Sequence, residues 1–350
     1  MLPILLDILR CPVTREKLKL TTLKKGTKNY NGKDHEIILE GCLESSVMLY
    51  PLIGGIPRML VEAYKDYGDF LRKHVADFEA KAKKIEATYG DLIKVVEKKN
   101  KHTKKAFEIE WGLFNYEEDK VWDEDREGML QRFLAENAET KESLNGKWIF
   151  DAGCGNGMLN EDVGSTGANI VGMDFSLSVE RAFEKNQQQT TFFIQGDVQF
   201  PPVAFEHFDI VHSSGVLICT NNSELTFSCL SPCIKENGKM SIWLYHPRKN
   251  TIHNIFNWMR NWTSKLPLRL QYFLYSITLL PISFIIKRIK GNKQNKREMM
   301  IDILDWFSPE FRWEHYHDEA TAWFLKRNFT DIQVTTNEVF GFNIIGTKRP

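Results

Sequence analysis

The chain has 350 residues, with 46 Lys and Arg against 46 Asp and Glu, and so carries no formal net charge. Its length suits one large domain with a smaller one, and its charge balance gives no global attraction to nucleic acid or to anionic membranes. The six cysteines form no Cys-x-x-Cys pair, and the first residues do not read as a signal peptide. We therefore expect a reduced, cytoplasmic protein without disulfides, and nucleic acid as a partner is disfavoured.

Residues 1–60 read as short strands and turns. LLDILRCPVTREKLKL followed by GCLESSVMLYPLIGGIPRML resembles the small ribbon domain related to the activator subunit of tRNA methyltransferases. That ribbon implies two Cys-x-x-Cys pairs for zinc, but here Cys11 stands alone because Thr14 occupies the second position. We predict a degenerate ribbon without a metal, which packs on the main domain or presents a substrate.

Residues 61–145 carry long Lys/Glu runs in a helical pattern, which predicts a solvated helical linker and cap. From residue 146 short apolar segments alternate with helical ones. The predicted strands are 147–153, 169–175, 191–197, 208–214, 239–245, 331–336 and 342–348. This pattern predicts a doubly wound, mostly parallel α/β sheet that ends in an antiparallel hairpin, spanning 146–350 with a helical insertion at 249–316.

The segment FDAGCGNGML places three glycines at alternate positions behind an acidic residue that ends the first strand. Gly153, Gly155 and Gly157 allow a ligand to approach the backbone closely. The spacing differs from the dinucleotide fingerprint G-x-G-x-x-G. Asp151 would repel a pyrophosphate but suits a ligand with an ammonium group, as in S-adenosylmethionine. Cys154, inside the turn, could be a nucleophile but fits better as a small packed residue.

The next strand ends supply further candidates for binding this cofactor. Asp174, followed by Phe175, ends the second strand, where a carboxylate accepts hydrogen bonds from ribose hydroxyls. Gly196, Asp197 and Val198 follow the third strand and could meet the adenine amino group and ring edge. Ser213 and Ser214 end the fourth strand beneath the cofactor, and Trp111 could close over it.

Residues 146–248, with the terminal hairpin, resemble class I S-adenosylmethionine-dependent methyltransferases. The ribbon fused to such a methyltransferase resembles a bacterial group that shares EIEWGLF, GVL, DWFSP and a final GTK, found here at 108–114, 215–217, 305–309 and 346–348. The resemblance implies methyl transfer but not the acceptor. Many relatives carry GVLHHT, whereas here Ile218 and Cys219 replace the two histidines, which leaves a non-catalytic cofactor-binding module as an alternative. RNA methylation is a third alternative, disfavoured by the neutral charge.

Catalytic residues are harder to assign, because a base is needed only when the acceptor must lose a proton. His246, directly after the fifth strand, is the first candidate for a base or an acceptor-orienting group. Asp305 and Trp306 could line the acceptor pocket. His212 lies inside a strand and fits packing better.

The insertion contains FLYSITLLPISFII, fourteen residues without a charge, flanked by basic residues. This run is shorter than a membrane span, and Pro281 should break a helix within it. A packed lid, a dimer face and an interfacial membrane helix over 265–290 all remain open. The membrane alternative would make the protein membrane-associated and its acceptor lipid-linked rather than a soluble small molecule.

Overall fold

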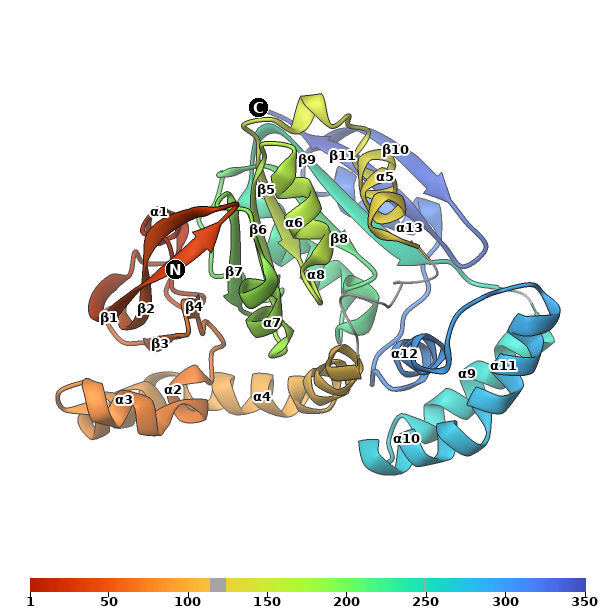
Figure 1. The fold of residues 1–350 in the computed structure, drawn as a ribbon, viewed down its shortest axis with the longest axis horizontal. Helices are drawn as coiled ribbons and strands as arrows, with labels where there is room; N and C mark the ends of the chain where they lie inside the picture. Colours follow the sequence, from red (N-terminus) through yellow and green to blue (C-terminus); the bar gives the residue numbers. More distant parts are fainter. Residues whose placement is uncertain (114–123, 249) are drawn as a thin grey trace.

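The computed structural model describes residues 1–113, 124–248 and 250–350, so parts of the predicted cap and insertion lie outside the described residues. A seven-stranded sheet forms the centre of the molecule, in the order β10-β11-β9-β8-β5-β6-β7 (Figure 1). The strands are β5 (Trp148–Ala152), β6 (Asn169–Asp174), β7 (Thr191–Gln195), β8 (Phe208–Ser214), β9 (Ile234–Tyr245), β10 (Phe329–Asn337) and β11 (Gly341–Lys348). All seven predicted strands are confirmed, although β9 begins earlier than predicted.

Strands β5 to β9 pair in parallel, and β11 joins β9 antiparallel before β10 closes the edge. Helices α6 (Met158–Ser165) and α7 (Ser178–Lys185) lie on one face, together with α5 (Arg126–Asn137). Helices α8 (Ser223–Leu230) and α13 (His317–Leu325) cover the other face, where Phe227 packs on Phe324. The predicted doubly wound α/β fold is therefore confirmed.

The strand order reverses at β5, which pairs with β6 on one side and with β8 on the other. The chain leaves β5 toward one face of the sheet and leaves β8 toward the other. A crevice opens at the carboxyl ends of neighbouring parallel strands where this happens. The glycine turn, the end of β6 and the end of β8 all meet at this crevice.

The N-terminal region forms a separate four-stranded antiparallel sheet of β1 (Lys19–Tyr30), β2 (Lys33–Glu44), β3 (Leu49–Ile53) and β4 (Ile56–Pro57), preceded by α1 (Ile4–Ile8). Its core is continuous with that of the large sheet, since one cluster of buried side chains runs from Leu5 to Ile344. Arg58 seals the junction: it is buried, pairs with Glu180 at 2.6 Å, and forms a parallel bridge to Gln195.

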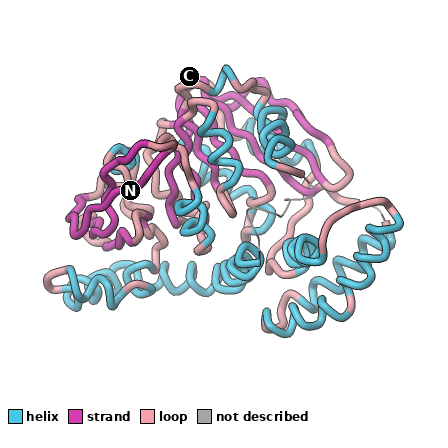
Figure 2. The backbone as a smooth tube through the Cα atoms, in the orientation of Figure 1, coloured by secondary structure: helices cyan, strands magenta, loops and turns pink. Residues whose placement is uncertain are grey.

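The long helix α4 (Phe78–Leu113) follows α2 (Ala63–Asp66) and α3 (Gly68–His74) and crosses below the carboxyl ends of the strands (Figures 1 and 2). The insertion forms α9 (Thr251–Thr263), α10 (Leu268–Ile277), α11 (Leu279–Ile289) and α12 (Lys296–Phe307). Helix α12 packs against α4, whereas α9 to α11 project from the body. The short helices are η1 (Glu142–Leu144), η2 (Leu217–Cys219) and η3 (Ser231–Cys233).

The prediction that Pro281 breaks the apolar run is wrong in its position. Helices α10 and α11 meet at Thr278 with a bend of 45°. Pro281 lies in the first turn of α11, where its missing N–H costs no helical hydrogen bond. Among the described residues, no single helix meets the length and hydropathy of a membrane span, and only the bent α10–α11 pair does so jointly.

Candidate functional site

The glycine turn after β5 depends on left-handed backbone. Gly153 and Gly155 have φ of +100° and +53°, which residues with a side chain rarely adopt. A Cβ on Gly153 would lie 2.2 Å from Val216 Cγ2, and a Cβ on Gly155 would lie 2.6 Å from the ring of Trp111. Both glycines line a cavity at the strand-order reversal, so the turn presents bare backbone to it.

This cavity, called here the switch cavity, collects most of the predicted cofactor residues. Gly153, Gly155, Asp174, Phe175, Gly196, Asp197, Val198 and Trp111 all line it. Residues from three further segments complete its wall: Lys99, Asn100, Thr103 and Phe107 of α4, Ser214 to Val216 and Cys219 to Asn221 after β8, and Asp305 and Phe311 around the end of α12.

Asp174 joins the glycine turn to the end of β6. Its Oδ2 accepts a hydrogen bond from the Gly155 amide at 3.1 Å, and its Oδ1 accepts from the amide and hydroxyl of Ser176. Burial raises the pKa of Asp174, while the Ser176 and Gly155 hydrogen bonds act in the opposite direction. The carboxylate is thus held in one orientation at the cavity wall.

Asp197 is fixed in a similar way after β7. Its Oδ1 accepts from the Gln199 amide at 2.8 Å, and its Oδ2 accepts from the Asn100 side chain at 2.5 Å. Asn100 comes from α4, so the cap reaches into the site directly. Phe107 follows on the same face of α4, and the centroid of its ring lies 6.1 Å from that of Phe175.

One face of α4 lines the site, and of its residues only Trp111 was predicted. Asn100, Thr103, Phe107 and Trp111 follow each other at steps of three and four residues, which places them on one side of a helix. This spacing is visible in the sequence. It was not recognised because the surrounding Lys and Glu residues suggest a solvated helix.

The Thr103 hydroxyl bears on whether the cavity fits a polar ligand. Thr103 is buried and lines the switch cavity, yet its Oγ1 has no hydrogen-bond partner within the described part of the chain. Buried hydroxyls are normally paired. Bare glycine backbone, two oriented carboxylates, an orphaned hydroxyl and the rings of Phe107 and Phe175 together fit a nucleoside with ribose hydroxyls and a flat base.

Asp151 lies in a second recess, which shares Trp111, Gly153, Gly155 and Ser214 with the switch cavity. Its carboxylate is not free, since Oδ2 accepts from Asn160 at 2.9 Å and Oδ1 lies 3.2 Å from His212 Nδ1. His212 Nε2 lies 2.9 Å from Glu136, which in turn pairs with Arg132. Asp151 is therefore part of a buried relay of charges rather than an isolated anion.

His212 carries a proton in this relay. Burial alone would lower its pKa, but the hydrogen bonds and charges of Asp151 and Glu136 outweigh burial and raise the pKa to about 9. His212 is buried within the sheet, as expected, since it is 2% exposed. Its ion pairs with two carboxylates were not foreseen, because one of them comes from α5.

Besides Asp151, three predicted cofactor residues lie outside the switch cavity. A Cβ on Gly157 would meet Ala182 at 2.5 Å, so this glycine, at the N-cap of α6, serves close packing. Ser213 is buried and donates to the Ala152 carbonyl at 2.7 Å, while Ser214 faces the cavity because side chains alternate along a strand. Cys154 lines the second recess, and burial raises the pKa of its thiol, which disfavours a nucleophilic thiolate.

The prediction that places His246 at the site has to be corrected, because the structure does not bring this residue to the switch cavity. Its amide donates to the Phe340 carbonyl, and its Nε2 lies 3.0 Å from the Glu338 carbonyl. The imidazole thus ties the end of β9 to the segment between β10 and β11. The sequence placed it correctly after β9, but the hairpin that captures it is more than 90 residues away.

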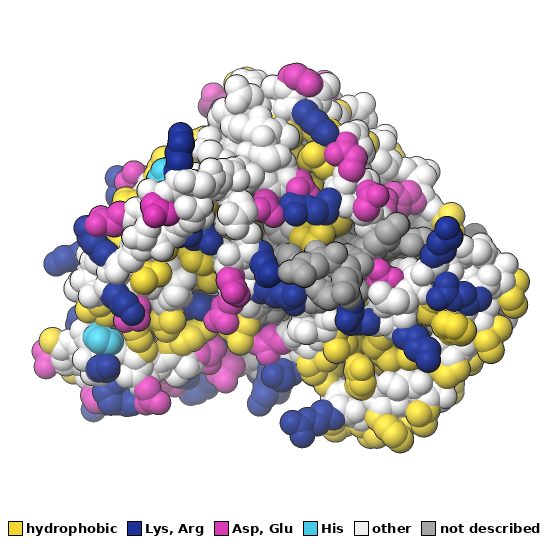
Figure 3. Space-filling view, viewed as in Figure 1, with side chains coloured by type: hydrophobic (Ala, Val, Ile, Leu, Met, Phe, Trp, Pro, Cys, Tyr) yellow, Lys and Arg dark blue, Asp and Glu magenta, His cyan; other side chains and the backbone are white. Residues whose placement is uncertain are grey.

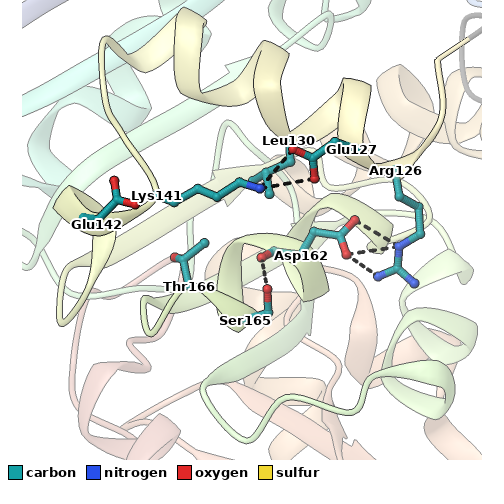
Figure 4. A pocket seen from close by; sticks show the side chains of 8 residues that line it. All are labelled: Arg126, Glu127, Leu130, Lys141, Glu142, Asp162, Ser165 and Thr166. Carbon is teal, nitrogen blue, oxygen red and sulfur yellow. Dashed lines mark hydrogen bonds and ion pairs between the residues drawn. The ribbon is translucent and has the colours of Figure 1, made fainter.

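The surface depression in Figure 4 is a separate feature. It lies between α5 and the carboxyl-terminal half of α6, away from the glycine turn, and Arg126 and Lys141 occupy it with ion pairs to Asp162 and Glu127. These two ion pairs involve both of its basic side chains, and Glu142 is a third acidic residue of its lining. Within the described residues, no group of three or more His, Cys, Asp or Glu side chains could hold a metal ion.

Comparison with known proteins finds similarity to methyltransferases. Residues 150–242 match the family model of a methyltransferase domain. The ubiquinone biosynthesis O-methyltransferase, mitochondrial, of Rattus norvegicus is 29% identical over 116 residues, which cover 30% of this chain. The match spans about a third of that relative, 33% of its length. The segment that the family model matches, residues 150–242, contains the glycine turn and the ends of β6, β7 and β8.

Among solved structures, a magnesium protoporphyrin IX methyltransferase from Synechocystis with bound SAH has a TM-score of 0.43 and 15% identity, covering 70% of this chain and 97% of that chain. Human N-acetylserotonin methyltransferase has a TM-score of 0.38 and 16% identity, covering 65% of this chain and 57% of that chain. The similarity to a methyltransferase domain thus covers residues 150–242.

Proposed function

We propose that this chain is an enzyme that transfers the methyl group of S-adenosylmethionine to a small-molecule acceptor. The observation that carries the proposal is the switch cavity, where the glycine turn, Asp174 and Asp197 meet at the strand-order reversal of a matched methyltransferase domain. The acceptor class follows from the enclosed cavity, whose aromatic walls suit a compact molecule.

The residues present fit the cofactor. Asp174, oriented by Gly155 and Ser176, would accept from the ribose hydroxyls. Phe107, Phe175 and Val198 would hold the base, with the Thr103 hydroxyl free to donate or accept beside it. The second recess, with Asp151 and Glu136, would face the amino acid end.

When bound, the cofactor supplies an electrophilic methyl group on a sulfonium. The protein's own contribution is to orient the acceptor and exclude water. Trp111 packs against Gly155, and α4 covers the carboxyl ends of the strands, so this helix closes one side of the cavity.

Calorimetric titration of S-adenosylmethionine and S-adenosylhomocysteine tests the proposal. We expect micromolar binding to the wild type. Asp174→Ala should weaken binding by about 1.5–3 kcal/mol, the usual value of hydrogen bonds to a charged group. Asp318→Ala, an exposed carboxylate on α13, is the matched control and should bind like the wild type. Absence of binding to the wild type would contradict the proposal.

A lipid-linked acceptor is the second candidate, because the insertion carries an exposed apolar surface. The outer side chains of α9 to α11 repeat at three- and four-residue steps, so each helix turns one apolar stripe outward. They are Ile255, Trp258, Trp262, Leu270, Phe273, Ile277, Ile282, Ile285, Ile286 and Ile289. Trp262 is 68% exposed and Ile289 is 81% exposed, although the opposite side of the insertion forms its own core.

Basic residues border this outer face. Lys265, Arg269, Arg288 and Lys290 are exposed beside the stripes, and Figure 3 shows apolar and basic side chains together on the projecting insertion. Exposed apolar area with a cationic border is typical of surfaces that bind anionic bilayers. We propose that the outer face of α9 to α11 lies in the interface of an anionic membrane, from which the acceptor would be taken.

Cosedimentation with vesicles tests the membrane proposal. Vesicles with anionic lipid should bind the wild type, and vesicles of neutral lipid should bind it weakly. Replacing both Trp258 and Trp262 with Ser should abolish binding, whereas Val95→Ser, an equally exposed apolar residue on α4, should not. Equal binding by the double variant, or none by the wild type, would favour a soluble acceptor.

A further inference from the structure

The switch cavity extends beyond the cofactor residues into a chamber formed by the insertion. Cys219, Thr220 and Asn221 line it from the segment after β8, and Asp305 and Phe311 line it from the end of α12. Burial raises the pKa of the Cys219 thiol, which therefore stays protonated and is no base. Asp305 is the one carboxylate that the insertion contributes to the described wall of the cavity.

Charged and titratable groups surround Asp305 from every neighbouring element. Glu110 comes from α4, Asp302 from the preceding turn of α12, Tyr245 from the end of β9 and Cys219 from η2. Arg312 supplies the nearby positive charge. It stacks 3.9 Å from the Tyr245 ring and 3.7 Å from the Trp306 ring, and it pairs with Glu314 at 2.8 Å, so its charge is already shared. Arg260 lies in the same cluster and donates to the Pro309 carbonyl.

The two carboxyl groups at this end of the cavity differ in environment. Glu110 is 3% exposed and does not line the cavity, and burial followed by the charges of Asp305 and Asp302 raises its pKa far above the usual range. Burial and then the charge of Asp302 raise the pKa of Asp305 to about 6, against the opposing effects of Arg312 and Tyr245. Of the two carboxyl groups, only Asp305 lines the cavity and can meet an acceptor there.

Building on the proposed function, we propose that Asp305 is the catalytic base that takes the hydroxyl proton of an aromatic acceptor. The O–H bond of the acceptor breaks and its proton moves to a carboxylate oxygen of Asp305. The acceptor oxygen forms the new bond to the methyl carbon, while the sulfur of the donor keeps the electron pair of the bond it loses.

The chamber favours a neutral hydroxyl acceptor over an anionic one. A carboxylate acceptor would enter beside Asp305, while the guanidinium of Arg312 is held by Glu314 and two rings. A phenol is neutral at pH 7 and gains from a base near it. Phe311 and Trp111 offer aromatic surfaces for its ring.

The test has two stages, so that failure of the proposed function and failure of this inference can be told apart. Calorimetry with S-adenosylmethionine comes first, and wild type, Asp305→Asn and Glu310→Gln should bind equally. Glu310 is an exposed carboxylate close in sequence that does not line the cavity. A wild type that binds no cofactor would end the proposed function itself.

Transfer of labelled methyl to a panel of phenols, catechols, aromatic carboxylates and amines comes second. We expect transfer to a phenol or catechol, with Asp305→Asn lowering kcat by roughly 100- to 10,000-fold and Glu310→Gln matching the wild type. The wild-type rate should rise through an acidic limb near pH 6 that Asp305→Asn abolishes. Asp302→Asn should move that limb to lower pH, because it removes a negative charge that raises the pKa of Asp305. Transfer only to carboxylates or amines, no transfer at all, or an unchanged limb in Asp305→Asn would overturn the assignment.

Discussion

His212 shows how a single buried side chain joins elements that are distant in sequence. Its two ring nitrogens face Asp151 of β5 and Glu136 of α5, and its ring packs on Phe133 at 4.8 Å. Because both partners are carboxylates, the protonated ring is the form that the fold stabilises. The relay also fixes Asp151 beneath the glycine turn.

The first residue-scale prediction concerns this proton. The folded-state pKa of about 9 exceeds the unfolded value of 6.5, so the stabilisation is complete below pH 6.5 and is lost as pH rises through about 9. His212→Asn should therefore destabilise the protein by about 3–5 kcal/mol at pH 6, the usual cost of breaking a buried ion pair, and by less above pH 9. Urea unfolding at both pH values measures this, with the exposed His317→Asn as control. A destabilisation independent of pH would mean that His212 is neutral.

The second residue-scale prediction concerns the glycine turn. Gly153→Ala places a Cβ against Val216 and a side chain on left-handed backbone, at a cost of about 1–3 kcal/mol. Because the turn must shift, S-adenosylmethionine binding should be lost. Gly68→Ala, with ordinary space around it, is the control and should retain binding, as calorimetry can check.

At the scale of elements, α4 combines two roles along one helix. The side chains of α4 that line the switch cavity contact Asp197 and Phe175, whereas Glu110 lies near the carboxyl groups of α12. The capping of the strand ends therefore depends on a helix that is rich in charged residues. Helix α12 holds α4 from the insertion side, with Asn295 and Glu298 forming a capping box at its start.

Glu110 gives a prediction for this helix pair. Its folded pKa is raised, so the folded state binds the proton more tightly than the unfolded chain, and stability falls as pH rises above about 4.5. Glu110→Gln should reduce this decline by about 1.4 kcal/mol for each unit of pKa shift. Comparing unfolding free energies of variant and wild type at pH 5 and pH 8 tests this. Parallel pH profiles would show that Glu110 is not buried as an acid.

For the whole molecule, the N-terminal sheet and the large sheet behave as one unit. Their side chains share one core, Met59 donates to the Gln195 carbonyl at 2.7 Å, and Arg58 pairs with Glu180. The N-terminal sheet thus joins the edge of the large sheet at β7. The resemblance of this region to an activator subunit remains a prediction.

Cooperative unfolding should follow from this shared core. We expect tryptophan fluorescence and circular dichroism to report one coincident transition. Arg58→Ala should destabilise that transition by about 1.5–3 kcal/mol, because it removes the hydrogen bonds that this buried guanidinium donates to Glu180 and Gln195. Lys24→Ala, on the exposed part of β1, is the control. Two separate transitions in the wild type would instead indicate independent domains.

The strands, the doubly wound sheet and the glycine turn could be predicted from the sequence, because apolar runs and turn glycines act over a few residues. The structure brings Gly153, Asp174 and Asp197 to one cavity, as expected for strand ends that share one edge of a parallel sheet, and their role in cofactor binding stays a prediction. Only the tertiary structure decided which side chains meet across long separations. Asn100 on Asp197, Glu136 on His212, Glu110 behind Asp305 and the capture of His246 by the terminal hairpin all depend on packing between remote elements. Local sequence patterns carry no information about those contacts, because the contacts arise from how whole helices cover the sheet.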